Sequence, residues 1–362
     1  MPFKSLSNSR TFLIGNWLLL SSRLSFFLLH VRKIFGAVAL LVLFSVTARS
    51  EGLLLVANKG DQTLSIINPA TGEQLAAVPE AGVTGHEVVA SADGKLAFVP
   101  IYGDSGVGHA GTDGSLIRVI DLEQHAIVGT IDFGKGMRPH CAVLGPKNGL
   151  IYVTTELADS ISIIDPKTLQ VVGAVPTGQA QSHMLAISHD GKTGYTANVG
   201  PGTVSVLDLE KGSTRKIIPV SKTTQRISIS RDDRWVFTAD QTQPRLAVID
   251  TRKNEVVKWI QLPGTAYGTA TTPDGRWLIV ALNSINKVAF VHLPAMQVVQ
   301  TLDVPKSPQE VLVRPDGQTA YVSCDASREI VVIDLKQLNH FVVEKTIAAG
   351  KGADGLAWAA AK

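Results

Sequence analysis

The sequence predicts an all-β protein, a seven-bladed β-propeller of four-stranded antiparallel blades. The first observation is a repeat, because an apolar strand that ends in Asn, Asp or His recurs through the chain. These ends lie 53, 44, 43, 42, 42 and 42 residues apart, at Asn68, Asp121, Asp165, Asp208, Asp250, His292 and Asp334. The second observation is a turn aspartate at Asp93, Asp190, Asp232, Asp274 and Asp316; the last four lie 42 residues apart, and GPKNG around Lys147 takes the place of this turn in the second repeat. Strand-rich repeats of this length are typical of propeller blades.

Each repeat contains four short segments rich in Val, Ile and Thr. In the third repeat they cover residues 183–188, 193–197 and 203–208, with a displaced fourth segment at 170–176. Gly, Pro, Asn and Asp separate the segments, which indicates antiparallel hairpins. We expect the Asn or Asp after the third strand to cap, with its side chain, the turn to the fourth.

The two ends of the chain predict how the ring closes. The last repeat supplies strands at 329–334, 342–348 and 355–361, and the chain then stops. Residues 53–58 (LLLVAN) match the second strand of the third repeat, GYTAN at 194–198. We therefore expect the N-terminal strand to complete the last blade, which removes an exposed sheet edge. Residues 51–362 would form this single propeller domain.

Residues 1–50 have the pattern of a secretory signal peptide. Arg32 and Lys33 precede an uncharged apolar run over 34–46, and Ala48 and Ser50 provide small residues before a cleavage site at Glu51. A translation start near Val31 would give this signal an ordinary length. The prediction is a periplasmic or secreted protein, and an uncleaved N-terminal membrane anchor is the alternative.

The composition of the chain limits the classes of binding partner that we expect. Charged residues make up 18% of the chain and the net charge is +3, without the basic stripe of a nucleic-acid binder. The two cysteines, Cys141 and Cys324, fall in different blades, which argues against a disulfide between them. We expect a monomer whose partner is a small-molecule ligand or a periplasmic protein, with no nucleic acid and no membrane span in the mature chain.

The residues that head the innermost strand of each blade form the candidate site. Because innermost strands line the central channel, their first side chains should surround its mouth. These residues are His86, His140, His183, Gln225, Tyr267, Gln309 and Asp354. Blade closure makes Asp354, His86, His140 and His183 a continuous arc. This arc suits a divalent transition metal held by imidazole and carboxylate, a small ligand or anion, or a purely structural lining.

An insertion at Tyr102–Gly114 should emerge beside these histidines. It lies between the second and third strands of the first complete repeat and carries His109, which joins the candidate ligand-binding residues. Its GVGHAG stretch fits the dinucleotide fingerprint in letters only, because a strand follows where a helix is required. Function is often added to a rigid scaffold by loops of this kind.

Two family resemblances follow from these segments. DGKTGYTANVGPGTVSVLD, at 190–208, resembles the YVTN-type repeat of exported YncE-like propellers, within the WD40/YVTN repeat-like superfamily. MRPHCAVLGPKNGLIYVTTEL, at 137–157, resembles the seven-bladed 6-phosphogluconolactonase family. The second resemblance implies catalysis by Arg138, His140 and Glu156, with His or Glu as general base and Arg stabilising an oxyanion.

The favoured function is an exported binding or scaffold propeller that holds a small ligand or metal at the His-lined channel mouth. A lactonase-type hydrolase is one alternative. The other is an electron-transfer partner subunit of a quinoprotein or haem enzyme, in which the cofactor would belong to the partner because the chain has no C-x-x-C-H motif.

Overall fold

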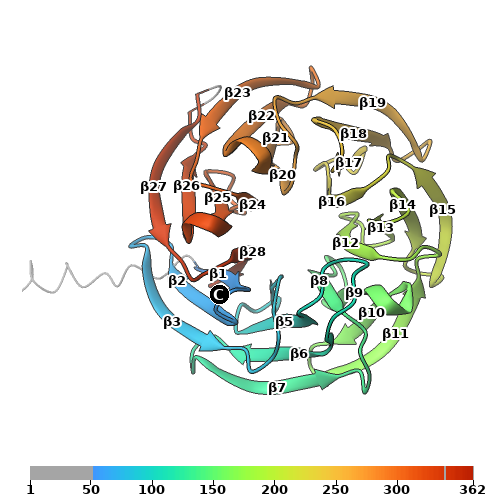
Figure 1. Ribbon diagram of the computed structural model, residues 1–362, viewed down its shortest axis with the longest axis vertical. Coiled ribbons are helices and arrows are strands. Elements are labelled where there is room, and N and C mark those ends of the chain that lie inside the picture. Colours follow the sequence, from blue (N-terminus) through green and yellow to red (C-terminus); the bar gives the residue numbers. More distant parts are fainter. Residues whose placement is uncertain (1–51, 338–339, 362) are drawn as a thin grey trace, which may run out of the picture. The chain divides into compact units, whose positions relative to one another are not determined.

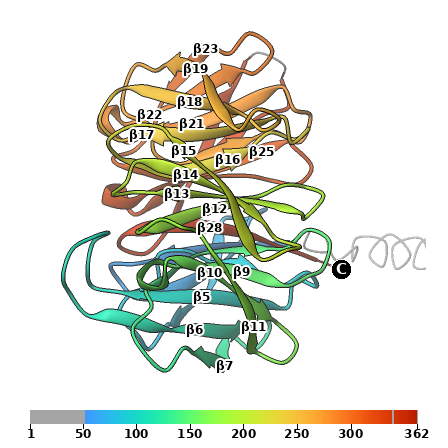
Figure 2. The same ribbon diagram turned by 90° about the vertical axis from the view of Figure 1, so that its right-hand side faces the viewer.

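The computed structural model describes residues 52–337 and 340–361, and the predicted signal peptide lies outside them. Seven sheets of four antiparallel strands follow one another around a ring (Figure 1). The sequence prediction of a seven-bladed propeller is therefore confirmed. Figure 2 shows the same ring turned by 90°.

The blades are numbered along the chain, and the seam blade, blade 7, combines both chain ends. Blades 1 to 3 contain β4 Val89–Ala90, β5 Leu96–Gly103, β6 Asp113–Asp121, β7 Ala126–Asp132; β8 Pro139–Leu144, β9 Ile151–Thr155, β10 Ser160–Asp165, β11 Gln170–Pro176; β12 Ser182–Ile187, β13 Thr193–Asn198, β14 Thr203–Asp208, β15 Ser213–Pro219. Blades 4 to 6 contain β16 Thr224–Ile229, β17 Trp235–Asp240, β18 Arg245–Asp250, β19 Glu255–Gln261; β20 Thr269–Thr271, β21 Trp277–Leu282, β22 Lys287–His292, β23 Gln297–Asp303; β24 Pro308–Val313, β25 Thr319–Cys324, β26 Glu329–Asp334, β27 Val342–Ala348. Blade 7 contains β28 Ala353–Ala360, β1 Gly52–Asn58, β2 Thr63–Asn68 and β3 Glu73–Pro79. Three short 3-10 turns follow β9, β21 and β25: η1 Glu156–Ala158, η2 Asn283–Ile285 and η3 Asp325–Ser327.

The strands are apolar on both faces because each blade packs between two others. In blade 3, β13 and β14 are buried after their first residue, whereas the outer strand β15 is largely exposed. Between blades 5 and 6 the Phe290 and Phe341 rings stack, with their centroids 4.2 Å apart. Burial of this kind contributes roughly 25 cal/mol per Å² of apolar surface, so neighbouring blades stabilise one another.

The predicted turn caps are present at the ends of the third strands. The Asp165 carboxylate accepts a hydrogen bond from the Lys167 backbone N–H at 2.9 Å, and Asp334 does the same for Lys336 at 2.9 Å. His292 closes its turn differently, because its carbonyl oxygen accepts from the Ala295 N–H at 3.1 Å. The recurring Asp is therefore a structural residue.

The ring closes at blade 7 as predicted. The C-terminal strand β28 pairs with β1, with Leu54 opposite Trp358 and Leu55 opposite Ala357. The N-terminal segment supplies β1 together with β2 and β3, so three of the four strands come from that end. Closure places the innermost strand of blade 7 beside that of blade 1.

The remaining structural expectations concern cysteines and membranes. Cys141 in β8 and Cys324 in β25 are buried and unpaired, as their places in different blades predicted. Within residues 52–337 and 340–361, no helix has the length and apolar character needed to cross a membrane.

Candidate functional site

The structure brings three of the predicted residues into one cluster. The ring centroids of His86 and His140 are 5.3 Å apart, and those of His140 and His183 are 3.6 Å apart. They come from blades 1, 2 and 3, and we call them the His cluster. The Asp354 carboxylate lies 4.0 Å from His86 Nδ1 and completes the predicted arc.

The other predicted residues make local contacts away from the His cluster. The Gln225 amide donates to the Tyr267 hydroxyl at 3.2 Å, and the Gln309 amide donates to Ser307 Oγ at 3.0 Å. The His109 side chain is exposed, and its backbone carbonyl accepts from Arg138 at 2.8 Å. The expectation that the His109 imidazole joins the channel mouth has no support in this arrangement.

Tyr102 is a site residue that the sequence did not single out. Its ring lies 5.2 Å from those of His86 and His140 and 5.9 Å from that of His183. The side chain is buried, and its hydroxyl donates to Glu156 Oε2 at 2.5 Å. Burial and this hydrogen bond raise the pKa of Tyr102 well above its usual range. Tyr102 therefore packs against all three imidazoles as a neutral phenol.

Glu156 and Arg138 join the insertion to blade 2. Arg138 Nη1 contacts Glu156 Oε1 at 3.3 Å, and its Nε contacts the Asp113 carboxylate at 2.6 Å. The Gly108 backbone N–H also donates to Glu156 Oε1, at 3.3 Å. Burial opposes ionisation of Glu156, but contacts with His183 and Tyr102 outweigh it and lower its pKa.

These contacts bear on the lactonase alternative. A general base needs a carboxylate or imidazole ready to take a proton, and an oxyanion donor needs N–H groups that point at the reacting atom. Glu156 already accepts three hydrogen bonds and has a lowered pKa. Arg138 already binds Glu156, Asp113 and the His109 carbonyl. The arrangement favours a structural role for this pair.

The imidazoles themselves have unused hydrogen-bonding capacity. His140 and His183 are 2% and 3% exposed, and the Nδ1 atom of each is buried without a hydrogen-bond partner. Burial lowers the pKa of His86 to about 4 and also lowers the pKa values of His140 and His183. At neutral pH the cluster therefore presents uncharged imidazoles, and the Nδ1 atoms of His140 and His183 can each take part in one further hydrogen bond.

The stacking of these rings bears on the predicted metal site. The lone pair of an imidazole nitrogen lies in the ring plane, and the His140 and His183 rings stack with only 31° between their planes. Their lone pairs therefore do not converge on one point. Among the described residues no three His, Cys, Asp or Glu side chains are grouped to hold a metal. The metal site at His86, His140, His183 and Asp354 stays a prediction.

The side chain of Arg226 also crosses the central channel, which the sequence did not indicate. Arg226 follows Gln225, one of the predicted channel-mouth residues. The Arg226 guanidinium, from blade 4, contacts Glu87 of blade 1 at 2.6 Å, Glu310 of blade 6 at 2.7 Å and Asp354 of blade 7 at 3.1 Å. Its Cζ lies 4.5 Å from the Tyr267 ring centroid. We call Arg226, Glu87, Glu310 and Asp354 the arginine hub. The hub links four blades across the ring.

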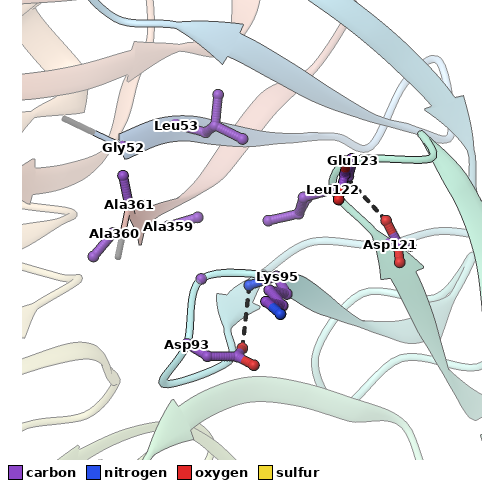
Figure 3. Close-up of a pocket in the computed structure, with 11 residues that line it drawn as sticks. Gly52, Leu53, Asp93, Lys95, Asp121, Leu122, Glu123, Ala359, Ala360 and Ala361 are labelled. Atoms are coloured by element: carbon purple, nitrogen blue, oxygen red, sulfur yellow. Dashed lines mark hydrogen bonds between the residues drawn. The ribbon is translucent and has the colours of Figure 1, made fainter. Parts of the chain in front are cut away.

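Two surface hollows are relevant to ligand access. A cavity of about 400 Å³ lies between the insertion and blades 2 and 3, and Gly108, Arg138, Glu156 and Gln181 are among its lining residues. A pocket of about 500 Å³, called the seam pocket, lies between the ends of β1 and β28 and two turns of blade 1 (Figure 3). The seam pocket is lined by Asp93 and Asp121, which cap their own turns through the Lys95 and Glu123 N–H groups. The cavity beside the insertion reaches the His cluster through Glu156, whose Oε2 lies 3.7 Å from His183 Nδ1.

Replacing His140 with Gln tests its neutral state. An unfolded histidine takes up a proton below about pH 6.5. The folded His140, with its lowered pKa, does not, so the wild-type protein loses stability as pH falls through that value. We expect the stability difference between His140→Gln and wild type to shift in favour of the variant by up to about 1.4 kcal/mol per pH unit below pH 6.5. Urea unfolding at pH 7.5, 6 and 5 measures it, and a pH-independent difference would contradict a buried neutral imidazole.

Fold and site together define a seven-bladed propeller with a buried histidine cluster beneath an inserted loop. The chain belongs to the family described as a domain of unknown function, DUF5074, whose model matches residues 124–307. A chain from a solved structure of Kuenenia stuttgartiensis hydrazine synthase is similar, with 17% identity and a TM-score of 0.67 over 80% of this chain and 94% of that one. At this identity the likeness concerns the fold alone. A search of curated proteins gives no match.

Proposed function

We propose that this protein is an exported binding propeller of the YncE-like kind that holds a small polar ligand against the His cluster. The observation that carries the proposal is the buried Nδ1 atom of His140, which has no hydrogen-bond partner, together with the Nδ1 atom of His183, which lies 3.7 Å from Glu156 Oε2 and so outside hydrogen-bond distance. A buried polar atom without a partner costs about 1–3 kcal/mol. A ligand that hydrogen-bonds to these atoms would remove that cost, which gives binding a source of affinity.

Charge indicates which ligands suit the site. The imidazoles are uncharged at neutral pH, and the nearby arginine hub has three carboxyl groups for one guanidinium. Burial raises the pKa of Glu87 to about 8, so this carboxyl is mostly protonated at pH 7, and Lys59 Nζ lies 3.3 Å from the Asp354 carboxylate. The hub therefore carries little net charge, and neither a simple anion nor a simple cation would gain much Coulomb attraction there. An uncharged polar molecule fits better. This ligand class replaces the anion considered from the sequence.

The test is to identify what accompanies the protein when it is purified from the producing cell. Native mass spectrometry with elemental analysis should find a small molecule bound to the wild-type protein and absent from His140→Ala. His125→Ala, which alters an exposed imidazole in a turn of blade 1, is the matched control and should retain the ligand. Equal ligand content in His140→Ala and wild type, or no ligand under several growth conditions, would contradict the proposal.

A further inference from the structure

We propose that the Tyr102–Gly114 insertion is a lid over the His cluster, that Arg138 is the latch that holds it, and that the cavity beneath it is the entrance to the site. The entrance role rests on the proposed function. The lid and latch depend only on the chain itself, so the two ideas can fail separately.

The latch consists of contacts from one side chain. Arg138 Nε binds the Asp113 carboxylate at 2.6 Å, and Arg138 Nη2 donates to the His109 carbonyl at 2.8 Å. Both partners belong to the insertion, whereas Arg138 lies just before β8 of blade 2 and is buried. One guanidinium thus ties two points of the loop to a neighbouring blade.

The lid begins and ends at glycines of the paired strands β5 and β6. Gly103 has a φ of +111°, and a Cβ there would collide with the Thr112 carbonyl oxygen. A Cβ on Gly114 would collide with the Ile101 carbonyl oxygen. Both ends therefore require glycine, the residue that best allows large backbone rotations.

Apart from the latch, the tip of the lid is attached through the Gly108 N–H, which donates to Glu156 Oε1 at 3.3 Å. Gly108, His109 and Ala110 are exposed, although the same residues line one side of the cavity of about 400 Å³. Segments with few buried contacts open locally at low cost. Breaking the latch should therefore free the loop without unfolding the blade beneath it.

Opening the lid would uncover the approach to the imidazoles. Glu156 lines the cavity, accepts the Gly108 N–H and the Tyr102 hydroxyl, and lies 3.7 Å from His183 Nδ1. Glu156 is therefore the cavity-lining residue that also contacts the His cluster. The volume is within the range of small-molecule sites.

Diethyl pyrocarbonate is a probe that needs no knowledge of the ligand. The unprotonated nitrogen of a neutral imidazole attacks the reagent and takes up an ethoxycarbonyl group, and the other ring nitrogen loses its proton. The rest of the reagent leaves as ethanol and carbon dioxide. Peptide mass spectrometry gives a rate for each histidine. In the wild-type protein we expect His140 and His183 to react at least about tenfold more slowly than the exposed His109 and His125.

Asp113→Asn removes the charged partner of the latch, and Arg138→Gln removes the latch itself. We expect both to raise the His140 and His183 rates by about tenfold. Asp165→Asn, which alters a turn cap on the opposite face of blade 2, is the matched control and should leave the rates unchanged. Melting temperatures confirm that each variant is folded, and if Arg138→Gln does not fold, Asp113→Asn decides alone.

Rates for His140 and His183 that stay at the wild-type level in the folded latch variants would overturn the lid. Rates that equal those of His109 in the wild-type protein would overturn it too. Neither result depends on whether a natural ligand exists.

Discussion

Deletion of residues 353–362, which removes β28, is expected to abolish cooperative folding. This strand pairs with β1 along its length and buries Ala353, Leu356 and Ala359. It also carries Asp354, one of the three carboxylates of the arginine hub. Without it the ring has an unpaired edge at β1, and blade 1 loses a neighbour. The cost should equal or exceed a typical domain stability of about 5–15 kcal/mol.

Circular dichroism melting measures this result. The deletion variant should lack a cooperative transition, whereas a variant that lacks only Lys362 should melt like the full chain. A deletion variant with an unchanged midpoint would show that the ring does not depend on closure at blade 7.

Arg226→Ala is expected to cost about 3–5 kcal/mol, because it leaves buried carboxyl groups without their cation. Arg226 is 2% exposed and contacts Glu87, Glu310 and Asp354 from three other blades. The exposed Arg231, in the same blade, provides the matched control, and Arg231→Ala should change stability by no more than about 0.5 kcal/mol. Urea unfolding of the three proteins at pH 7 gives the comparison.

Glu87→Gln separates charge from hydrogen bonding in the same hub. Burial raises the pKa of Glu87 to about 8, against the lowering effect of Arg226 and with a raising contribution from Glu310. The carboxyl is then mostly protonated at pH 7, so replacement by Gln should cost only about 1 kcal/mol or less. If Arg226→Ala costs no more than Glu87→Gln, the guanidinium is not the centre of the hub.

Much of this architecture could be predicted from the sequence because propeller geometry depends on regular spacing. Strand periodicity and the turn aspartates predict seven blades, and the match between 53–58 and 194–198 predicts closure at the seam. The place of His86, His140 and His183 at equivalent positions of consecutive blades predicts that they meet. Each of these predictions depends on the path of the backbone and not on the conformation of a side chain.

The site residues that the sequence did not indicate make contacts that depend on how far their side chains reach. Tyr102 is the first residue of an insertion, and nothing in its spacing shows that its ring turns inward to pack on three imidazoles. Arg226 spans the channel to acids on blades 1, 6 and 7, a contact between residues 84 to 139 positions apart. The sequence did contain one indication of this contact. Glu87, Arg226 and Glu310 each follow a predicted channel-mouth residue, and opposite charges at equivalent positions of a ring can meet.

The roles of Arg138 and Glu156 also required the structure. A family resemblance implied a catalytic pair, but their partners are in the insertion, whose path a sequence pattern does not specify. The carboxylate is saturated by Tyr102, Gly108 and Arg138. These contacts favour a latch over a hydrolytic centre.

The most direct test of the central claim is a high-resolution crystal structure of the protein purified from the producing cell. The account predicts electron density for a bound molecule within hydrogen-bond distance of Nδ1 of His140 or His183. Density that shows both nitrogens bonded to groups of the protein itself would contradict it.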